Sequence, residues 1–266
     1  MKLRDRMTPL SQLRYLAWWA GLLGDEVEVR LSTGQWLLLQ KSMMLGLAVA
    51  YEIFVMDTYR CPRELSPQSV RRIVDVGANV GYSVTYWSSN FPTASIEAFE
   101  PHPEHLRLLR RSLRINRIEA RVNVHPVAVG QAAGTFELID AGTASAIAHC
   151  GAAPNGDTSR RLQVEVVDFF HAIKDLQIDL LKLDCEGAEY DILMDPRFAE
   201  INARNLVMEW HSTAAHPDAC AELSARLREL EWDVQPGKIA HVEMLEGLGM
   251  LGAGILWAFR QDRSGS

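Results

Sequence analysis

The chain has 266 residues, 48% of them apolar, which is enough to bury the core of one α/β domain with a short extension. Its 27 lysines and arginines stand against 34 aspartates and glutamates, which gives a formal net charge of −7. That balance disfavours a protein that binds mainly through phosphate contacts, so no nucleic-acid partner is expected. The four cysteines form no Cys-x-x-Cys pair, which indicates free thiols in a reducing compartment, no structural zinc and a cytoplasmic location.

The N-terminal part of the chain is expected to form an accessory segment that begins with a helix. The basic residues Lys2, Arg4 and Arg6 precede the apolar stretch 16–23, which is shorter than the roughly 20 residues that span a bilayer. No transmembrane segment is therefore expected, and acidic residues stand where a signal-peptide cleavage site would lie. We expect a helix that packs its Trp and Leu side chains on the domain or on a second subunit, the latter giving a homodimer. Loose docking on a membrane or another partner is the alternative.

Two further patterns complete this segment. Residues 27–31 alternate, a short turn follows, and residues 35–39 continue the pattern as a second strand, which together predict a hairpin. Apolar residues with helical spacing follow at 43–59, and two prolines then end the predicted helix. The expected divisions of the chain are an accessory segment, a main domain and a disordered tail, at residues 1–67, 68–262 and 263–266.

From residue 68 onward, predicted strands and helices alternate. Strands are expected at 72–76, 95–99 and 122–125, and the helices between them at 81–90 and 103–116. Strand–helix–strand units of about 30 residues indicate parallel pairing with right-handed crossovers. The predicted fold class is therefore α/β, with a doubly wound, mostly parallel, Rossmann-like sheet.

Later segments extend this fold. The β-rich segments 134–139 and 161–167, separated by a Gly/Ala/Ser-rich loop, are expected to pair as an antiparallel insertion. The domain is then completed by two strands, an amphipathic helix and two late strands, one of them antiparallel, at 178–183, 205–209, 217–230, 232–234 and 254–259.

The first strand of the main domain runs into a glycine-rich turn and then a helix. Gly77 and Gly81 remove side chains where the turn is tight, and Asn79 tolerates a positive φ well. The helix that follows presents free N–H groups and the positive end of its dipole to a carboxylate, such as that of a methionine moiety. Asp75 can accept a hydrogen bond from a ligand ammonium, directly or through water. On this pattern alone, a tight turn without a ligand is an alternative.

The second strand supplies an acidic residue, Glu100, at its carboxyl end. A carboxylate there can accept hydrogen bonds from both hydroxyls of a ribose, as in doubly wound nucleotide sites. Pro101 ends the strand. NAD would also require such an acid, but its fingerprint is Gly-x-Gly-x-x-Gly, whereas this turn places three residues between Gly77 and Gly81. The spacing favours S-adenosylmethionine (SAM) over NAD.

Further charged residues follow two later strands. Asp184 lies in an acidic turn at the edge where doubly wound proteins bind ligands, and it is the first candidate to face the sulfonium or the substrate. Glu186 or Glu189, in the same turn, can instead cap the next helix, and this alternative fits Glu189 better than Asp184. The following strand ends with Glu209 and His211. Because an imidazole can gain or lose a proton near neutral pH, His211 is a candidate general base, although a lone histidine is more often structural.

Together these motifs resemble the FkbM family of SAM-dependent methyltransferases. The resemblance covers roughly residues 70–212 and rests on Val74-Asp75-Val76-Gly77-Ala78-Asn79-Val80-Gly81, Ala98-Phe99-Glu100-Pro101, Val127-Ala128-Val129-Gly130, the run from Asp179 to Glu189, and Glu209-Trp210-His211. It implies a class I methyltransferase core, SAM as methyl donor and, usually, O-methylation of a hydroxyl on a natural product or glycan. The cofactor-binding candidates are Asp75, Gly77, Asn79, Gly81, Tyr82, Glu100, Pro101 and Ala128.

Methyl transfer from a sulfonium is an in-line displacement, so the protein must position the acceptor, exclude water and remove one proton. Asp184, Glu209 and His211 are expected to surround the transferred methyl. A divalent metal on Asp184 and Glu209 is a less favoured alternative. The loop of small residues 141–146 is expected to fold over the site; the alternative is that small residues are simply tolerated in a hairpin loop and have no role at the site. Two other functions stay open, a SAM-binding partner protein without catalysis and an NAD-dependent oxidoreductase.

Overall fold

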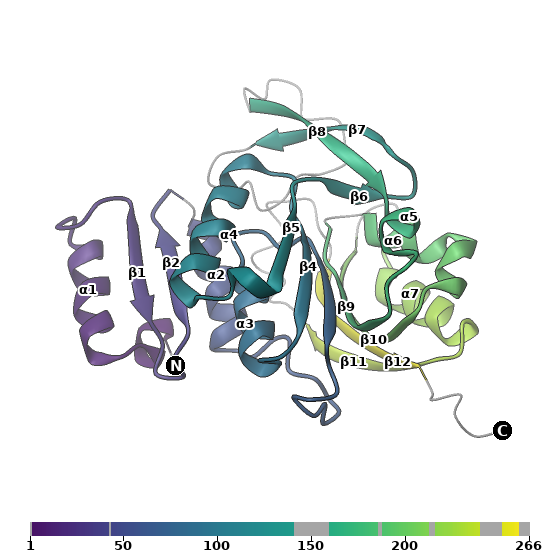
Figure 1. Ribbon diagram of the computed structural model, residues 1–266, viewed down its shortest axis with the longest axis horizontal. Helices are drawn as coiled ribbons and strands as arrows, with labels where there is room; N and C mark the ends of the chain where they lie inside the picture. The colour runs from purple at the N-terminus through teal and green to yellow at the C-terminus, as the bar shows by residue number, and fades with distance from the viewer. Residues whose placement is uncertain are drawn as a thin grey trace.

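The computed structural model describes residues 2–42, 44–140, 160–185, 188–212, 216–239 and 252–260. Its main sheet contains β3 (Arg72–Val76), β4 (Ser95–Phe99), β5 (Val122–His125), β9 (Ile178–Leu183), β10 (Ala203–Ser212), β11 (Trp232–Ile239) and β12 (Gly252–Arg260). These seven strands are ordered β11-β12-β10-β9-β3-β4-β5 (Figure 1).

The pairing within this sheet explains where a ligand can bind. The five neighbouring strands β5, β4, β3, β9 and β10 pair in parallel, and β12 is antiparallel to both β10 and β11. The predicted doubly wound sheet with a late antiparallel strand is therefore confirmed. The chain winds from β3 through β4 to β5 in one direction, then from β9 to β10 in the other, so the order reverses between β3 and β9. Folds of this kind bind ligands in the crevice outside the carboxyl ends of the strands at that point.

Two layers of helices cover the sheet. On one face lie α2 (Met44–Phe54), α3 (Tyr82–Asn90) and α4 (Pro103–Asn116), and on the other α5 (Phe169–Ile173), α6 (Ala188–Met194) and α7 (Ala219–Glu229) (Figure 1). Because successive side chains of a strand point to opposite faces, Ile73 joins the core under α2, α3 and α4, whereas Val74 joins the core under α5, α6 and α7. Short 3-10 turns lie at Leu3–Arg6, Glu119–Arg121 and Pro196–Glu200.

A second sheet lies above the carboxyl edge of the first (Figure 1). It consists of β6 (Ala128–Gly130), β7 (Gly134–Asp140) and β8 (Arg160–Asp168), in the order β6-β8-β7. Strands β7 and β8 pair antiparallel, as the sequence predicts, and β6 is parallel to β8. The small residues 141–146 lie outside the described residues.

The N-terminal segment packs as an extra layer outside α4. The predicted hairpin is formed by β1 (Glu26–Arg30) and β2 (Trp36–Gln40). Arg111 of α4 donates to Glu28 at 2.8 Å, and it also forms an ion pair with Glu26. Asn116, at the end of α4, exchanges hydrogen bonds with the backbone of Trp36. The hairpin shares one apolar core with α3 and α4, and the division near residue 68 stays a prediction.

The first helix differs from the expectation. Helix α1 (Pro9–Trp19) begins before the apolar stretch 16–23 and ends before Gly21, whose φ is 78°. Only Trp18 and Ser11 are buried, and most leucines of this region face away from the domain. Trp18 therefore packs on the domain as expected, whereas the leucines do not, and their packing on a second subunit stays a prediction. None of the described helices is long and apolar enough to cross a membrane.

Candidate cofactor and acceptor site

The turn after β3 has the backbone conformation that its glycines predict. Gly77, Asn79 and Gly81 have φ values of 75°, 49° and 90°. A Cβ atom on Gly77 would lie 1.7 Å from the carbonyl oxygen of Asp184, so the turn and the end of β9 can approach each other only because this residue has no side chain. A Cβ atom on Gly81 would lie 2.6 Å from Leu109 of α4. Gly77 therefore shapes the ligand edge, and Gly81 allows α3 to pack on α4.

Glu100 is held at the same edge by backbone donors. Its Oε2 accepts from the N–H of Asn79 at 2.8 Å, and its Oε1 accepts from the N–H of His102 at 2.8 Å. The ring atom Nδ1 of His105 lies 3.3 Å from Oε1. The carboxylate is almost fully buried, yet it forms part of a cavity wall. These contacts fix the orientation of Glu100 before any ligand binds.

A cavity of about 340 Å³ lies next to Glu100, a size that suits a small-molecule cofactor. Six of the predicted site residues contribute to its wall: Gly77, Asn79, Glu100, Pro101, Ala128 and Asp184. The second sheet supplies apolar side chains that the sequence did not indicate, Leu138, Val164 and Val166. Their alternation marked them as strand residues, but nothing in the sequence places that sheet over the cavity.

His105 is a further wall residue that was not predicted. It is 4% exposed, and its Nε2 has no hydrogen-bond partner among the described residues. It lies in the first turn of α4, whose N-cap is His102. A histidine five residues after the predicted ribose acid, in the first turn of the predicted helix 103–116, was the available signal, because such a side chain can reach back to that carboxylate.

Three predicted cofactor residues do not line this cavity. Asp75 is fully buried, and its Oδ1 lies 3.1 Å from Nζ of Lys182. Burial raises the pKa of Asp75, although Lys182 and Ser83 act against this shift. The hydroxyl of Tyr82 donates to the carbonyl oxygen of Leu38 at 2.7 Å, so it ties α3 to the hairpin. Tyr82 and Gly81 therefore support the turn from behind, and a direct contact of Tyr82 with the ligand stays a prediction.

Lys182 is the centre of the site, and the sequence did not mark it. Its buried Nζ donates to the carbonyl oxygens of Val76 and Gly77 at 3.0 and 2.7 Å. The same atom lies 3.1 Å from carboxylate oxygens of both Asp75 and Asp184. Burial lowers the pKa of Lys182, but the two carboxylates outweigh it and raise this pKa above its usual value. Lys182 therefore stays charged and joins the turn after β3 to the end of β9.

The predicted reaction residues lie on one face of neighbouring strands. Leu183 pairs with Met208 in the parallel register of β9 and β10, and both point into the core under α5, α6 and α7. The next residues, Asp184 and Glu209, therefore point to the opposite face, and His211 shares that face. Nε2 of His211 lies 3.8 Å from Oε1 of Glu209. The structure brings the three predicted residues to one edge.

Charge and burial at this edge favour a proton acceptor. Burial and the nearby carboxylates of Asp184 and Glu52 raise the pKa of Glu209 well above its usual value. Tyr59, from the segment after α2, points its hydroxyl at Oδ2 of Asp184 at 3.4 Å. Burial and Asp184 raise the pKa of Tyr59, so the hydroxyl stays protonated. Tyr59 was missed because it lies far from the motifs in sequence.

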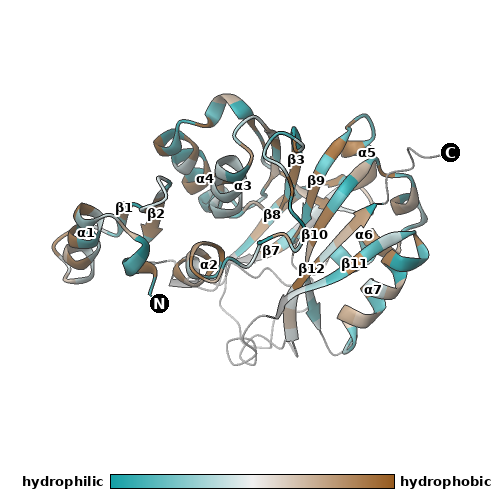
Figure 2. Cartoon of the chain, turned by 90° about the horizontal axis from the view of Figure 1, so that it is seen from below, coloured by the Kyte–Doolittle hydropathy of each residue, from teal (hydrophilic) through white to brown (hydrophobic). Residues whose placement is uncertain are grey.

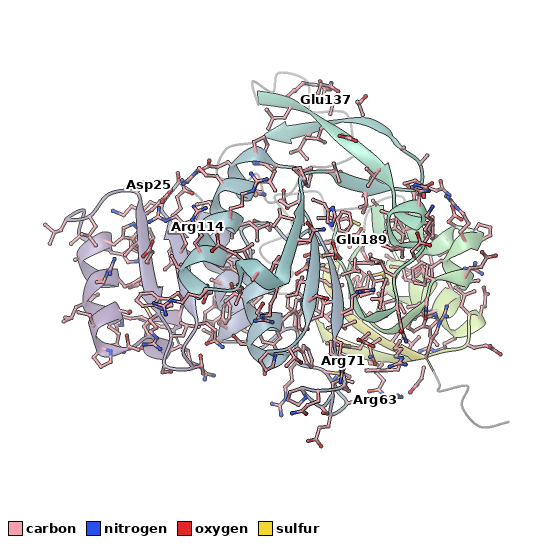
Figure 3. The ribbon with its side chains drawn as sticks, in the orientation of Figure 1. Asp25, Arg63, Arg71, Arg114, Glu137 and Glu189 are labelled. Atoms are coloured by element: carbon pink, nitrogen blue, oxygen red, sulfur yellow. The ribbon has the colours of Figure 1, made fainter. Side chains whose placement is uncertain are left out.

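Glu189 has a structural role beside the acidic turn, and Glu186 lies outside the described residues. The N–H of Cys185 donates to Oε1 of Glu189, as the helix-capping alternative for Glu189 supposed. Glu189 lies at the carboxyl edge of the sheet, whereas Arg71 and Arg63 lie at the opposite edge (Figure 3). Among the described residues, no group of three His, Cys, Asp or Glu side chains could hold a metal ion.

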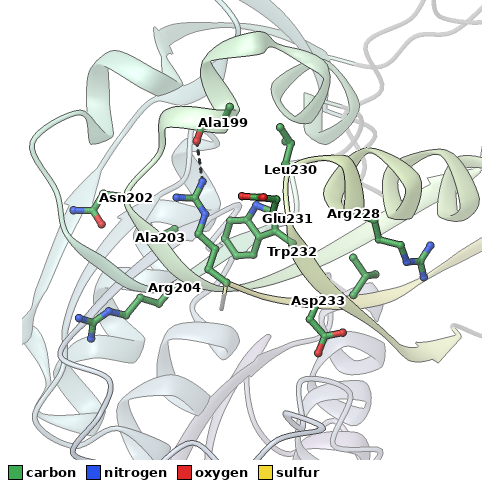
Figure 4. Close-up of a pocket in the computed structure, with 11 residues that line it drawn as sticks. Ala199, Asn202, Ala203, Arg204, Arg228, Leu230, Glu231, Trp232 and Asp233 are labelled. Atoms are coloured by element: carbon green, nitrogen blue, oxygen red, sulfur yellow. Dashed lines mark hydrogen bonds between the residues drawn. The ribbon is translucent and has the colours of Figure 1, made fainter. Parts of the chain in front are cut away.

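A second, wider hollow of about 880 Å³ lies at the opposite edge, around Trp232 (Figure 4). The guanidinium of Arg260 lies 4.9 Å from the Trp232 ring and donates to the carbonyl oxygen of Ala199 at 3.0 Å. Arg204 pairs with Asp179 at 3.4 Å. This hollow is at the amino ends of the parallel strands, away from the edge where doubly wound folds bind ligands.

The sheet order, the reversed β12, the glycine turn and the acid after β4 define a class I methyltransferase. The chain belongs to the methyltransferase FkbM domain family, whose model matches residues 75–231. It is a SAM-dependent methyltransferase, so the resemblance seen in the sequence and the prediction of SAM as the cofactor are both confirmed. The residues present fit SAM, because the cavity presents the fixed Glu100 carboxylate beside a turn free of side chains.

Several known proteins are similar to this chain. Methyltransferase sdnD of Sordaria araneosa is 29% identical, with 61% of this chain and 73% of that protein covered. The AMB antimetabolite synthetase AmbE of Pseudomonas aeruginosa is 30% identical, with 67% of this chain but 10% of that protein covered. The crystal structure of methyltransferase FkbM from Methylobacillus flagellatus KT matches with a TM-score of 0.52 at 16% identity, covering 79% of this chain and 48% of that one. This chain thus spans about half of the solved chain and a tenth of the synthetase.

Proposed function

We propose that this methyltransferase transfers the methyl group of SAM to a hydroxyl oxygen of a small natural product or glycan in the cytoplasm. The main support is the arrangement of Asp184 and Glu209, which lie side by side on one face at the ends of β9 and β10. Asp184 also borders the cavity that fits the cofactor. An acceptor held at this face would therefore meet both a carboxylate and the methyl donor.

On the cofactor side, each wall residue has a role in the proposal. Glu100 accepts hydrogen bonds from the ribose hydroxyls, and His105 keeps its carboxylate in position. The turn at Gly77 and Asn79 lets the backbone approach the ligand closely. Leu138 and Val164 of the second sheet pack on the adenine and exclude water. SAM, when bound, supplies an electrophilic methyl group on its sulfonium.

On the acceptor side, Glu209 takes the proton that the acceptor hydroxyl loses. A general base works best when its pKa lies near the working pH, and the raised pKa of Glu209 moves this carboxyl in that direction. His211 lies beside Glu209, with its Nε2 3.8 Å from Oε1, and so contributes a second polar group to the acceptor side. Lys182 fixes Asp184, which orients the acceptor. These steps assign the predicted residues Asp184, Glu209 and His211 to one acceptor site.

The acceptor class is supported by a relative and by charge. One similar protein is named as an antimetabolite synthetase, which favours a natural-product acceptor. The net charge of −7 disfavours nucleic acid. Cys61 and Cys220 are free thiols in the structure, in keeping with a cytoplasmic location.

The acceptor atom can be tested by following the methyl group. The protein is incubated with SAM that carries a ¹³C-labelled methyl and with matched pairs of acceptors that differ only in a hydroxyl or an amine. We expect a labelled methoxy signal in the NMR spectrum of the hydroxyl acceptor. A label on nitrogen with no methoxy product would overturn O-methylation. Titration with SAM, S-adenosylhomocysteine and NAD in parallel checks the cofactor, and SAM binding without turnover on any acceptor would point to a non-catalytic partner protein.

A further inference from the structure

The first helix carries an unusual amount of exposed apolar surface. In the part of the chain that the structure describes, seven large hydrophobic side chains are exposed, and six of them lie within residues 10–23. Leu22, Leu10 and Leu13 are 77%, 70% and 65% exposed. We call the set the α1 face, in which the last two leucines belong to the turn that follows the helix: Leu10, Leu13, Leu16, Trp19, Leu22 and Leu23. Contiguous apolar patches of this kind on a soluble domain mark interaction surfaces.

The α1 face cannot turn inward, because hydrogen bonds fix the other side of the helix. Oγ of Ser11 accepts from the N–H of Arg30 at 2.7 Å, and Nε1 of Trp18 donates to the carbonyl oxygen of Asp25 at 2.8 Å. Both contacts hold α1 against the hairpin. Helix α1 forms the end of the molecule farthest from β12 (Figure 1), and the view from below likewise shows it at the outer edge (Figure 2). Another molecule can therefore reach the face without displacing any described element.

The size of the face suits the centre of a protein interface. Six partly exposed side chains of this type present on the order of 500 Å² of apolar surface. A stable dimer buries about 800 Å² on each partner, with an apolar centre and a polar rim. Arg14, one residue after Leu13 and so about 100° around the helix, is placed at the rim. The α1 face thus supplies most of one side of such an interface.

Charge at the two ends of α1 favours a second copy of the same chain. Lys2, Arg4 and Arg6 precede the helix, with Asp5 as the one acid among them, and Asp25 follows it. Lys41 lies at the same end as Asp25, with its Nζ 5.4 Å from the Trp18 ring, so that end is close to neutral. Two copies of α1 packed antiparallel would place the basic end of each beside this neutral end of the other, whereas parallel packing would bring the two basic ends together. The helix dipoles favour the same arrangement. A helix that lies on an anionic membrane instead carries basic residues along its whole polar side.

We propose that the α1 face is the contact surface of a homodimer, in which a second copy of this chain packs its own α1 antiparallel against the first. The contact is isologous, because a twofold axis brings the same face of both copies together. No residue of the α1 face lines the cofactor cavity, so this contact leaves the cavity of each copy open whatever the methyl acceptor is.

The association state of the full chain tests this proposal. Sedimentation equilibrium over a wide concentration range is expected to show a monomer–dimer equilibrium for the wild type. The double variant Leu13→Glu, Leu16→Glu should dimerise at least about tenfold more weakly, since it places charges at the centre of the interface. Tyr51→Glu changes the seventh exposed hydrophobic residue, which lies on α2, and is the matched control. Unchanged S-adenosylhomocysteine affinity would show that both variants fold.

Three results would overturn the proposal. The wild type could stay monomeric at every concentration, or the double variant could dimerise as well as the wild type. The third result is that a monomeric wild type floats with phosphatidylserine-containing vesicles, while the double variant does not. That outcome would assign the α1 face to a lipid surface. Dimerisation that is lost in the double variant and kept in Tyr51→Glu supports the proposal.

Discussion

The cofactor side and the acceptor side of the sheet edge are built by different means. On the cofactor side, the backbone sets the geometry, through the close approach at Gly77 and the N–H groups that hold Glu100. On the acceptor side, charged side chains from β9 and β10 meet Tyr59 from the N-terminal segment. The first arrangement depends on residues that are close in sequence, and the second on distant residues brought together by the fold. Changes on the first side should therefore alter SAM binding, and changes on the second should alter turnover.

Lys182 joins the two sides, and its loss should have the largest effect. Lys182→Met leaves Asp75 buried beside no cation, and an uncompensated buried charge costs about 3–5 kcal/mol of folding free energy. Urea unfolding measures the loss. Lys174→Met, at an exposed position, is the control and should stay within about 0.5 kcal/mol of the wild type. Wild-type stability in Lys182→Met would show instead that Asp75 takes up a proton, as the direction of its pKa shift allows.

Glu209→Gln should have the largest effect on turnover. Removing a general base lowers kcat by about 10² or more. Below the raised pKa of Glu209 the carboxyl is protonated and cannot accept a proton, so kcat of the wild type should rise with pH through that pKa. The rise should be absent from Glu209→Gln and present in the exposed control Glu200→Gln. A pH profile that persists in Glu209→Gln would move the base role to another group.

Stability should respond to the same group in the opposite sense. The pKa of Glu209 is higher in the folded protein than in the unfolded chain, where a glutamate has a pKa of about 4.3. The stabilisation is therefore complete below that pH and is lost as the pH rises through the folded pKa. Thermal unfolding should show this slope in the wild type, and Glu209→Gln should flatten it.

Gly77→Ala tests the backbone side directly. The new Cβ would overlap the carbonyl oxygen of Asp184, and the positive φ adds strain, so S-adenosylhomocysteine should bind about 3 kcal/mol more weakly. Gly134→Ala is the matched control, because a Cβ there meets no atom within 4 Å. Titration calorimetry compares the two variants. Equal affinities would mean that the turn and the end of β9 can separate without harm to the cofactor site.

Glu100→Ala should cost less, because the turn stays intact. The loss of charge-assisted hydrogen bonds to the ribose should weaken SAM binding by about 1–3 kcal/mol. Glu97→Ala, on the same strand but paired with His125 outside the cavity, is the control. An unchanged SAM affinity in Glu100→Ala would remove this residue from the ribose role.

The same contrast explains how much the sequence could predict. The turn and Glu100 could be predicted because glycine spacing and an acidic residue at the end of a strand are local signals of a ligand-binding turn between a strand and a helix. The sheet was readable because apolar runs and helical periodicity alternate along the chain. Asp184, Glu209 and His211 could be placed at one edge because the carboxyl ends of parallel strands meet there.

What the sequence could not show depends on distant contacts. Lys182 lay inside an apolar strand, and only the fold reveals that Asp75 and two carbonyl oxygens face it. Tyr82 follows the glycine turn, yet the hairpin supplies the partner of its hydroxyl. The leucines of α1 look like core residues in sequence, but Ser11 and Trp18 decide which side of the helix faces the hairpin.

Tyr59→Phe has the smallest expected effect and gives the finest test of the acceptor side. The hydroxyl donates to Asp184 over a long distance of 3.4 Å. Its loss should therefore raise the activation free energy of turnover by about 0.5–1.5 kcal/mol and lower kcat accordingly, with S-adenosylhomocysteine affinity unchanged. Tyr82→Phe loses a 2.7 Å hydrogen bond to Leu38 away from the cavity and should lower stability without changing kcat. If Tyr59→Phe behaves like Tyr82→Phe, Tyr59 only packs on Trp87, and the acceptor side is built by β9 and β10 alone. If kcat falls while stability holds, the segment before β3 takes part in orienting the acceptor.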